Sequence, residues 1–241
     1  GGQYAAEEYG TDDLGTPLAG PQTQPFMFAS PEGDITIGFA VAGGDTNTVN
    51  FSPEIAVIST DNSPAGQNRD QTEGAAGENF LSVFVFRDVP SNSVWITNDV
   101  NGPAFLIGSG SHPHVARLAD SGFAIAWDGP TDSVRLRLYQ ADGTTPRTGI
   151  ITVDSANASQ SHVATLADGR VLVVWRDVTG AGPITAAILG RLYNADGTPD
   201  TDIFTIEART SFDPATGAPR AAQLADGRIV VTYQDGGSAD T

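Results

Sequence analysis

A segment of eight residues that recurs along the chain constrains the fold more than any other feature of the sequence. The segment 113–120 (Pro-His-Val-Ala-Arg-Leu-Ala-Asp) returns about 48 residues later as 161–168 (Ser-His-Val-Ala-Thr-Leu-Ala-Asp) and once more as 219–226 (Pro-Arg-Ala-Ala-Gln-Leu-Ala-Asp). Self-similarity at such a period is typical of solenoids, propellers and tandem arrays. The sequence therefore predicts a chain built from repeated supersecondary units.

Each copy of the segment is followed by a turn and an apolar run, which predicts a β-hairpin. The turn is Asp-Gly at 168–169 and 226–227 and Asp-Ser-Gly at 120–122, and glycine adopts positive φ there without a steric penalty. Two further strands follow, at 134–139 and 150–153 in one copy and at 188–193 and 203–206 in the next. Four short strands joined by tight turns are the content of one β-propeller blade.

The same template finds two looser copies nearer the N-terminus. In the first, 26–29 and 35–39 predict the hairpin and 54–58 the third strand. In the second, 81–94 aligns with the later copies, but 59–78 is polar and rich in Gly, Asn and Asp. The first strand of the second copy cannot be located from this pattern.

The two ends of the chain predict how the units are joined. The last copy stops after its second strand, near Asp235, while Gln3–Leu18 has the pattern of the missing third and fourth strands. We therefore expect an all-β fold, a β-propeller of five four-stranded blades in which the N- and C-terminal strands share one blade and leave no open edge. An open β-repeat array or a sandwich is the alternative. We expect residues 1–241 to form a single domain that is part of a larger chain. Its predicted blades are 21–66, 67–111, 112–160, 161–216 and 217–241, and residues 1–20 complete the last of them.

Composition excludes several classes of function. The chain has no cysteine, so disulfides, thiolate metal sites and cysteine nucleophiles are excluded. Its 29 acidic and 12 basic residues give a formal net charge of −17, which repels nucleic acids and anionic membranes. We expect neither nucleic-acid binding nor membrane insertion.

Four aspartates follow the second strand of their copies and form a candidate metal site: Asp88, Asp128, Asp177 and Asp235. In a propeller these carboxylates would form an acidic rim around one mouth of the channel. Calcium, which prefers six to eight oxygen ligands, is the cofactor that such a rim predicts. The alternative is that each aspartate caps its own turn.

Two histidines share one repeat position. His114 and His162 begin the first strand of their copies, where Phe26 and Arg220 stand in others. The first strand is innermost in a propeller, so the two imidazoles are expected near the channel mouth. A zinc site would need more ligands, and the change to Phe and Arg favours packing or hydrogen bonding.

Large aromatic residues end the second strand in four copies: Phe39, Trp127, Trp175 and Tyr233. Aromatic side chains bury much apolar area, so we expect them to pack between blades. Stacking against a sugar is the alternative.

The repeats over 112–160 and 161–206 resemble those of very large secreted bacterial proteins of the RTX or haemolysin type. The shared pattern is Pro-x-Val-Ala-x-Leu-x-Asp-Gly, a strand ending in Val-Val-Trp, and Arg-x-Tyr-x-Ala-Asp-Gly-Thr. This resemblance implies export to the medium or the cell surface, often for adhesion, and transfers no catalytic residue. The Gly-Asp nonapeptides that bind calcium in that family are absent from these residues.

From these patterns we expect a non-catalytic, adhesive or structural module at the bacterial cell surface or outside the cell. Its partner would be a surface glycan, a protein ligand or further repeats of the same protein. The alternative is a carbohydrate-active propeller enzyme, a glycoside hydrolase or lyase, because five-bladed rings also house glycosidases with paired carboxylates. The prominent acids recur from copy to copy, which favours a structural role over catalysis. No Gly-x-Ser-x-Gly, His-Glu-x-x-His or phosphate-binding loop is present.

Overall fold

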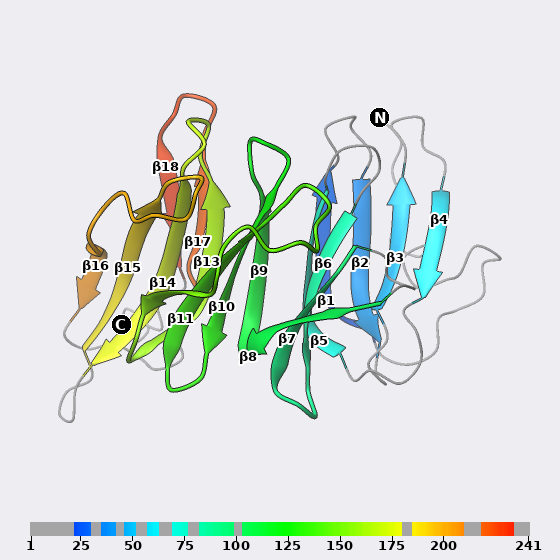
Figure 1. The fold of residues 1–241 in the computed structure, drawn as a ribbon, viewed down its shortest axis with the longest axis horizontal. Helices are drawn as coiled ribbons and strands as arrows, with labels where there is room; N and C mark the ends of the chain where they lie inside the picture. The colour runs from blue at the N-terminus through cyan, green and yellow to red at the C-terminus, as the bar shows by residue number, and fades with distance from the viewer. Residues whose placement is uncertain are drawn as a thin grey trace, which may run out of the picture.

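In the described part of the chain every regular element is a β-strand. The computed structural model describes residues 22–29, 35–41, 46–51, 57–62, 69–76, 82–98, 103–179, 185–209 and 218–233, and it describes side chains within 73–75, 83–98, 103–178, 186–208 and 218–233. Figure 1 shows the strands gathered into sheets, with β1–β4 at one end and β13–β18 towards the other.

The strands form four antiparallel four-stranded sheets and one hairpin, each in sequence order. The first sheet is β1 (Gln22–Ala29), β2 (Ile35–Val41), β3 (Thr46–Phe51) and β4 (Val57–Asn62). The second is β5 (Arg69–Ala76), β6 (Ser82–Asp88), β7 (Ser93–Thr97) and β8 (Phe105–Ser109). The third is β9 (Ser111–Arg117), β10 (Phe123–Gly129), β11 (Ser133–Tyr139) and β12 (Ile151–Asp154). The fourth is β13 (Ala158–Thr165), β14 (Val171–Thr179), β15 (Thr185–Tyr193) and β16 (Phe204–Arg209), and the hairpin is β17 (Arg220–Gln223) and β18 (Ile229–Thr232).

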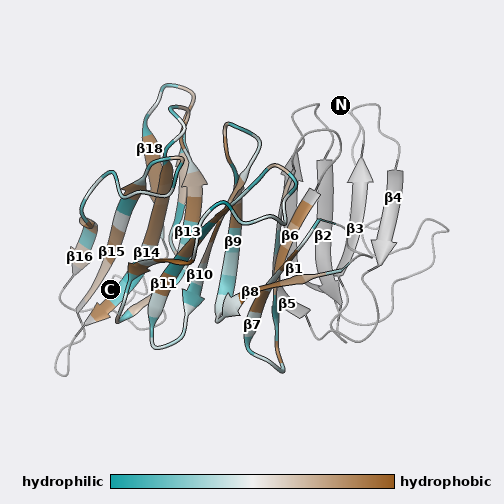
Figure 2. Cartoon of the chain, in the orientation of Figure 1, coloured by the Kyte–Doolittle hydropathy of each residue, from teal (hydrophilic) through white to brown (hydrophobic). Residues whose placement is uncertain are grey.

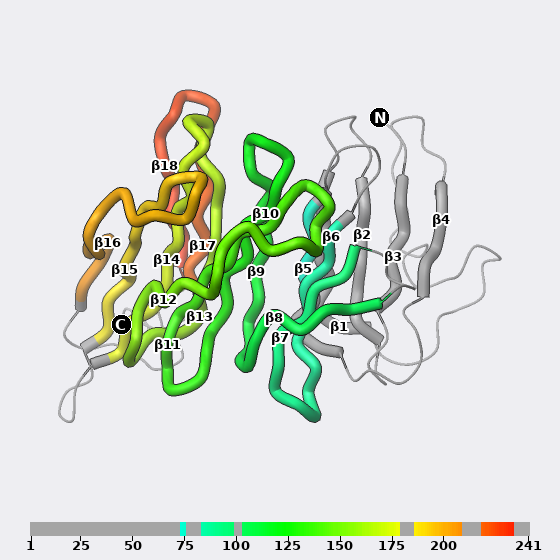
Figure 3. The backbone as a smooth tube through the Cα atoms, viewed as in Figure 1, coloured from blue at the N-terminus to red at the C-terminus, as the bar shows by residue number. Residues whose placement is uncertain are grey.

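The first strands of successive sheets lie against one another, which is the arrangement of propeller blades. β5 contacts β1 and β9, and β13 contacts β9 and β17; the tube in Figure 3 follows the chain through these sheets. Up-and-down four-stranded sheets joined through their first strands define the β-propeller architecture, so the predicted fold is confirmed. The prediction that Gln3–Leu18 completes the blade of β17 and β18 falls on residues outside the described ranges.

The hydrophobic core lies between neighbouring blades, because both faces of the inner strands are apolar. Phe123, Ile125 and Trp127 on one face of β10 pack against the second blade, in a cluster with Val83 and Val85. The opposite face of β10 packs against the fourth blade. Figure 2 shows the hydrophobic colour along β14 and β18, the second strands of the next two blades. Blade-to-blade burial thus holds the described sheets together.

The aromatic residues at the end of the second strand are buried between blades. Trp127 is 1% exposed and Trp175 is fully buried. The indole N–H of Trp127 donates to the Ser109 carbonyl at 3.2 Å, and that of Trp175 donates to an Asp154 carboxylate oxygen at 3.2 Å. Burial and satisfied indole donors support the expected packing role and leave neither ring face open to a sugar.

The Asp-Gly turns form as the sequence predicts. Gly169 and Gly227 have φ of +87° and +86°. The carboxylates of Asp168 and Asp226 each accept a hydrogen bond, at 3.1 Å, from the backbone N–H two residues later. Ser121 takes the glycine position of the third blade with φ of +68°.

Gly169→Ala is expected to lower the free energy of unfolding by about 1–2 kcal/mol, the cost of a Cβ in the left-handed region. Nothing lies within 4 Å of a Cβ built at Gly169, so the effect is conformational and not steric. Gly149→Ala is the matched control, because its Cβ also meets nothing and its φ lies outside that region. Urea unfolding of both variants measures the difference, and equal stability would contradict the turn assignment.

Two strands differ from the sequence-based expectation. The third strand of the first blade is β3 (Thr46–Phe51), and the segment 54–58 predicted for it overlaps only the start of β4. The first strand of the second blade, which could not be located, is β5. Both strands are polar, with runs such as Thr46-Asn47-Thr48 and Asp70-Gln71-Thr72, so they lack the apolar alternation on which strand prediction depends.

Candidate functional site

Each of the four complete blades carries a β-bulge in its first strand. In every case two residues on the first strand stand opposite one aromatic residue of the second strand. His112 and Gln160, which lie in two of these bulges, have positive φ of 49° and 54°. A bulge bends the strand and re-aims the next side chain, so the residue directly after the bulge holds an equivalent place in each blade.

These equivalent residues differ in chemistry from blade to blade. Their strand partners fix the equivalence, with Glu73 opposite Val85, His114 opposite Ala126 and His162 opposite Val174. The full row, in blade order, is Phe26, Glu73, His114, His162 and Arg220. We call Glu73, His114, His162 and Arg220 the axial cluster.

Direct contacts connect Glu73, His114 and His162 across the blades, and His162 also contacts the backbone next to Arg220. Glu73 Oε1 lies 3.4 Å from His114 Nδ1. The rings of His114 and His162 are 5.0 Å apart between centroids and inclined at 55°. The backbone N–H of Ala221, next to Arg220, donates to His162 Nδ1 at 3.3 Å. Four blades therefore bring two imidazoles, a carboxyl group and a guanidinium to one place.

Burial keeps both imidazoles of the axial cluster neutral near pH 7. Burial, followed by the charge of Arg220 and then of His162, lowers the pKa of His114 well below its usual value. Burial and then Arg220 lower the pKa of His162 to about 4. Burial raises the pKa of Glu73, and Arg220 opposes that rise. His162 Nδ1 accepts from Ala221, so its proton resides on Nε2.

The protein is expected to lose stability as the pH falls from about 6.5 towards 4. The pKa of His162 is about 4 in the folded protein and near 6.5 when unfolded, so the unfolded chain binds more protons between these values. The stability that comes from keeping His162 neutral is fully present above pH 6.5 and amounts to roughly 3 kcal/mol of unfolding free energy. Burial and Arg220 act on His114 in the same direction, while the raised pKa of Glu73 partly offsets them.

Urea midpoints measured between pH 4 and 7 test this pH dependence. His162→Gln, which cannot be charged, should show a flatter profile than the wild type across that interval. Parallel profiles would contradict the assignment of a buried neutral imidazole.

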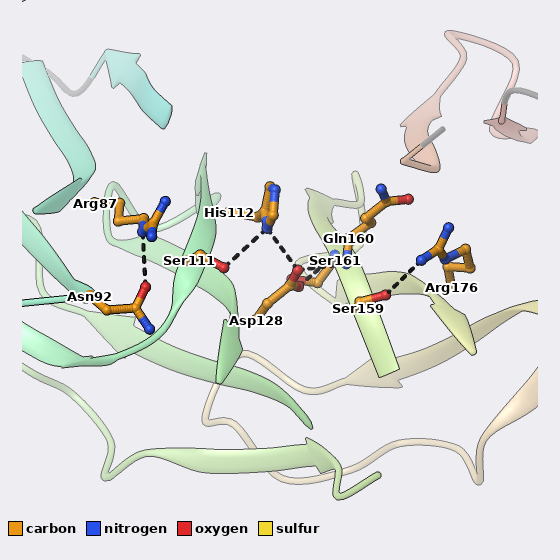
Figure 4. A network of polar contacts seen from close by, with 9 residues as sticks. All are labelled: Arg87, Asn92, Ser111, His112, Asp128, Ser159, Gln160, Ser161 and Arg176. Carbon is orange, nitrogen blue, oxygen red and sulfur yellow. Dashed lines mark hydrogen bonds and ion pairs between the residues drawn. The ribbon is translucent and has the colours of Figure 1, made fainter. Parts of the chain in front are cut away.

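Asp128, one of the predicted metal ligands, instead holds two blades together. It is 7% exposed and lies at the end of β10. Its carboxylate accepts from the backbone N–H of Gln160 at 2.7 Å and from the N–H and hydroxyl of Ser161 at 3.0 Å each. His112 Nδ1 is also 3.0 Å from Asp128, as Figure 4 shows. These bonds join the third blade to the bulge of the fourth, and we call them the Asp128 latch.

Asp88 and Asp177 lie one register position further along their strands than Asp128. Asp128 takes the place of Arg87 and Arg176, the residues that directly follow the buried aromatic. Successive strand residues face opposite sides, so Asp128 does not share a face with Asp88 and Asp177.

The surroundings of the remaining predicted ligands also differ. Asp88 caps its own turn by accepting the N–H of Ser91 at 3.2 Å. Burial and the nearby charge of Asp154 raise the pKa of Asp177. Asp235 lies outside the described residues. In the part of the chain that is described, no three acidic or histidine side chains are grouped to hold a metal ion, and calcium binding stays a prediction.

The sequence analysis identified three of the four residues of the axial cluster and missed Glu73. That residue lies on β5, the polar strand that the repeat template did not locate. The signal that could have found it is Phe86, which ends the second strand as Trp127 does. Counting back from this aromatic through the hairpin aligns Glu73 with His114.

Comparison with known proteins supports the fold. The chain matches no protein-family model and no curated protein. A solved structure of a protein of unknown function from Dyadobacter fermentans is similar, with a TM-score of 0.63 and 18% identity over 90% of this chain and 74% of that one. The α-L-arabinanase of Penicillium chrysogenum, solved with arabinobiose, gives a TM-score of 0.55 at 10% identity, covering 88% of this chain and 74% of the arabinanase.

A puromycin hydrolase also gives a TM-score of 0.55, at 16% identity over 90% of this chain. The chain spans only 37% of that hydrolase. At such identities the likeness shows a shared β-propeller fold.

These comparisons contradict the prediction of a non-catalytic adhesive or structural module. Solved proteins that share the fold over most of this chain include an arabinanase and a puromycin hydrolase. The described residues include no helix long and apolar enough to cross a membrane.

Proposed function

We propose that this chain is a carbohydrate-active β-propeller enzyme, a glycoside hydrolase or lyase, with its site at the axial cluster. The observation that carries the proposal is the convergence of Glu73, His114, His162 and Arg220 from four blades at one register position. A repeat position that carries three different kinds of polar group, a carboxyl group, two imidazoles and a guanidinium, fits a site better than a repeated structural contact. The fold likeness to an arabinanase supports the carbohydrate class.

The chemistry of the axial cluster suits proton transfer. A neutral imidazole is a base near pH 7, and Glu73 lies 3.4 Å from one nitrogen of His114. A carboxyl group in that position orients the ring and stabilises the imidazolium that forms when the other nitrogen takes a proton. Arg220 supplies a permanent positive charge for an anionic group.

We also propose that the protein acts outside the cell or at the bacterial cell surface. The resemblance of 112–206 to repeats of large secreted proteins supports export, and the absence of cysteine fits a fold held by packing alone. A surface or extracellular glycan is then the expected partner. An acidic chain of this kind stays soluble at low ionic strength.

Release of reducing ends from a panel of glycans tests the proposed function. Neutral polymers (arabinan, galactan, xylan) and acidic polymers (polygalacturonate, alginate, chondroitin) are incubated with the wild type and with His114→Ala. We expect cleavage of at least one polymer by the wild type and a loss of about a hundredfold or more in the variant, the range that acid–base groups contribute.

His112→Asn is the matched control for the loss of an imidazole. His112 is 45% exposed at its side chain and lies outside the axial cluster, and asparagine tolerates its positive φ. This variant should keep its activity. Absence of cleavage by the wild type with every polymer, or equal activity of His114→Ala, would contradict the proposed function.

A further inference from the structure

The composition of the axial cluster is unusual for glycoside hydrolysis. Hydrolysis generally uses two carboxyl groups that flank the scissile bond. Among the described side chains of the cluster, Glu73 is the one carboxyl group, and it is paired with an imidazole. The other members are a second imidazole and a guanidinium. These groups fit a different reaction, in which a base removes a proton from the carbon atom next to a carboxylate.

We propose that the axial cluster binds a uronate unit of an acidic polysaccharide and cleaves the chain by β-elimination. This inference rests on the proposed carbohydrate-active function and names its substrate class. The juxtaposition that carries it is a Glu73–His114 pair beside His162 and Arg220.

Each group has a separate task in this reaction. Arg220 and the Nε2–H of His162 bind the uronate carboxylate, because a guanidinium and a neutral N–H donor both match carboxylate oxygens. Binding of the carboxylate by these groups withdraws electron density from the uronate, and this makes the proton at C5 more acidic. Glu73 Oε1 lies 3.4 Å from His114 Nδ1. In the proposed reaction the proton of His114 stays on this Nδ1, and the lone pair of Nε2 on the other side of the ring acts as the base.

The elimination step balances without any further reactant. His114 Nε2 takes the proton from C5, and the electron pair of that C–H bond forms the double bond between C4 and C5. The bond from C4 to the glycosidic oxygen breaks, and this oxygen keeps the bonding pair. The imidazolium of His114 then returns its proton to the leaving oxygen. The products are an unsaturated uronate end and a new hydroxyl end.

The negative net charge of the chain repels an approaching polyanionic substrate, and salt screens this repulsion over long distances. At about 0.1 M salt the Debye length is roughly 10 Å, so most of the 29 acidic residues are screened from a substrate at the cluster. Arg220 is exposed, and among the described residues its guanidinium donates a hydrogen bond to the Pro219 carbonyl at 3.2 Å. Assays near physiological ionic strength are therefore appropriate.

Ultraviolet absorbance of the unsaturated product tests the inference separately from chain cleavage. Polygalacturonate, alginate and chondroitin are incubated with the wild type, and reducing ends are measured in the same samples. We expect absorbance and reducing ends to rise together with at least one uronate polymer. The same polymer with its carboxylates reduced to alcohols should give neither signal, because its C5 proton is not acidified.

Variants at His114 and Arg220 test which residue acts as the base and which one binds the carboxylate. His114→Gln should lower the rate of absorbance increase by about a hundredfold or more. Arg220→Gln should raise KM for the uronate polymer about tenfold or more, the scale of a lost charge-assisted hydrogen bond, and Arg220→Lys should restore part of it. Circular dichroism and thermal melting confirm that each variant is folded.

The outcomes separate this inference from the proposed function. Reducing ends without ultraviolet absorbance would mean hydrolysis, which overturns β-elimination and leaves the carbohydrate-active function standing. No cleavage of any polymer would overturn both. Equal cleavage of carboxylate and carboxyl-reduced polymers would also overturn the inference.

Discussion

Trp175→Ala should lower the free energy of unfolding by about 3–5 kcal/mol, the range for removing a large buried aromatic side chain. Trp175 is fully buried and packs in the cluster between the third and fourth blades, with Leu136 and Val163 among its neighbours. Removing the indole leaves a cavity between two rigid sheets, which cannot collapse onto it without separating the inner strands. The Asp154 carboxylate also loses a donor.

Urea unfolding of Trp175→Ala and Trp95→Ala measures this effect with a matched control. Trp95 lies on β7 and is only partly buried, so its replacement creates less cavity and costs less. We expect a clear difference between the two midpoints. A Trp175 variant no less stable than the Trp95 variant would contradict the account of blade-to-blade packing.

Asp128→Ala should lower the free energy of unfolding by about 3 kcal/mol, because one buried and one half-buried backbone donor lose their acceptor at about 1–3 kcal/mol each. These donors are the N–H groups of Gln160 and Ser161 in the fourth blade. Asp128→Asn should cost less, since its amide keeps one acceptor oxygen. The Asp128 latch is therefore predicted to be the strongest polar connection between the third and fourth blades.

Hydrogen exchange locates the effect of Asp128→Ala. The amides of Gln160 and Ser161 should exchange faster in this variant, while the exposed substitution Asp202→Ala should change neither exchange nor stability by more than about 0.5 kcal/mol. Equal stability of Asp128→Ala and Asp202→Ala would mean that the latch contributes nothing to holding the blades together.

The strands that the sequence predicted well are those in which packing dictates the residue. β10 and β14 are buried on both faces, so their apolar runs mark them clearly. β3 and β5 are polar, and pattern alone could not place them. Their pairing with β2 and β6 is determined by backbone hydrogen bonds, which leave little trace in side-chain chemistry.

A one-residue offset separates Asp128 from the other candidate metal ligands. Residue type alone aligns the four aspartates, whereas the buried aromatic is the fixed point of each copy. Asp128 directly follows Trp127, whereas Asp177 follows Trp175 by two positions. Since side chains alternate along a strand, this offset sends Asp128 to the blade interface.

The candidate site is partly visible in the sequence. The change from His114 and His162 to Phe26 and Arg220 favours packing or hydrogen bonding. A repeat position occupied by different polar groups is also what a site with separate tasks requires. The register of β5 adds Glu73 and makes the second interpretation the stronger one.

The imidazole NMR signals test the central claim most directly, because the chain contains three histidines. Titration of an inactive Glu73→Gln variant, which prevents turnover, with a saccharide that the wild type cleaves should shift the signals of His114 and His162 most. The signal of His112, which contacts Asp128 at the blade interface, should move least. Unchanged signals at saturation, or a shift confined to His112, would contradict the assignment of the axial cluster as the saccharide site.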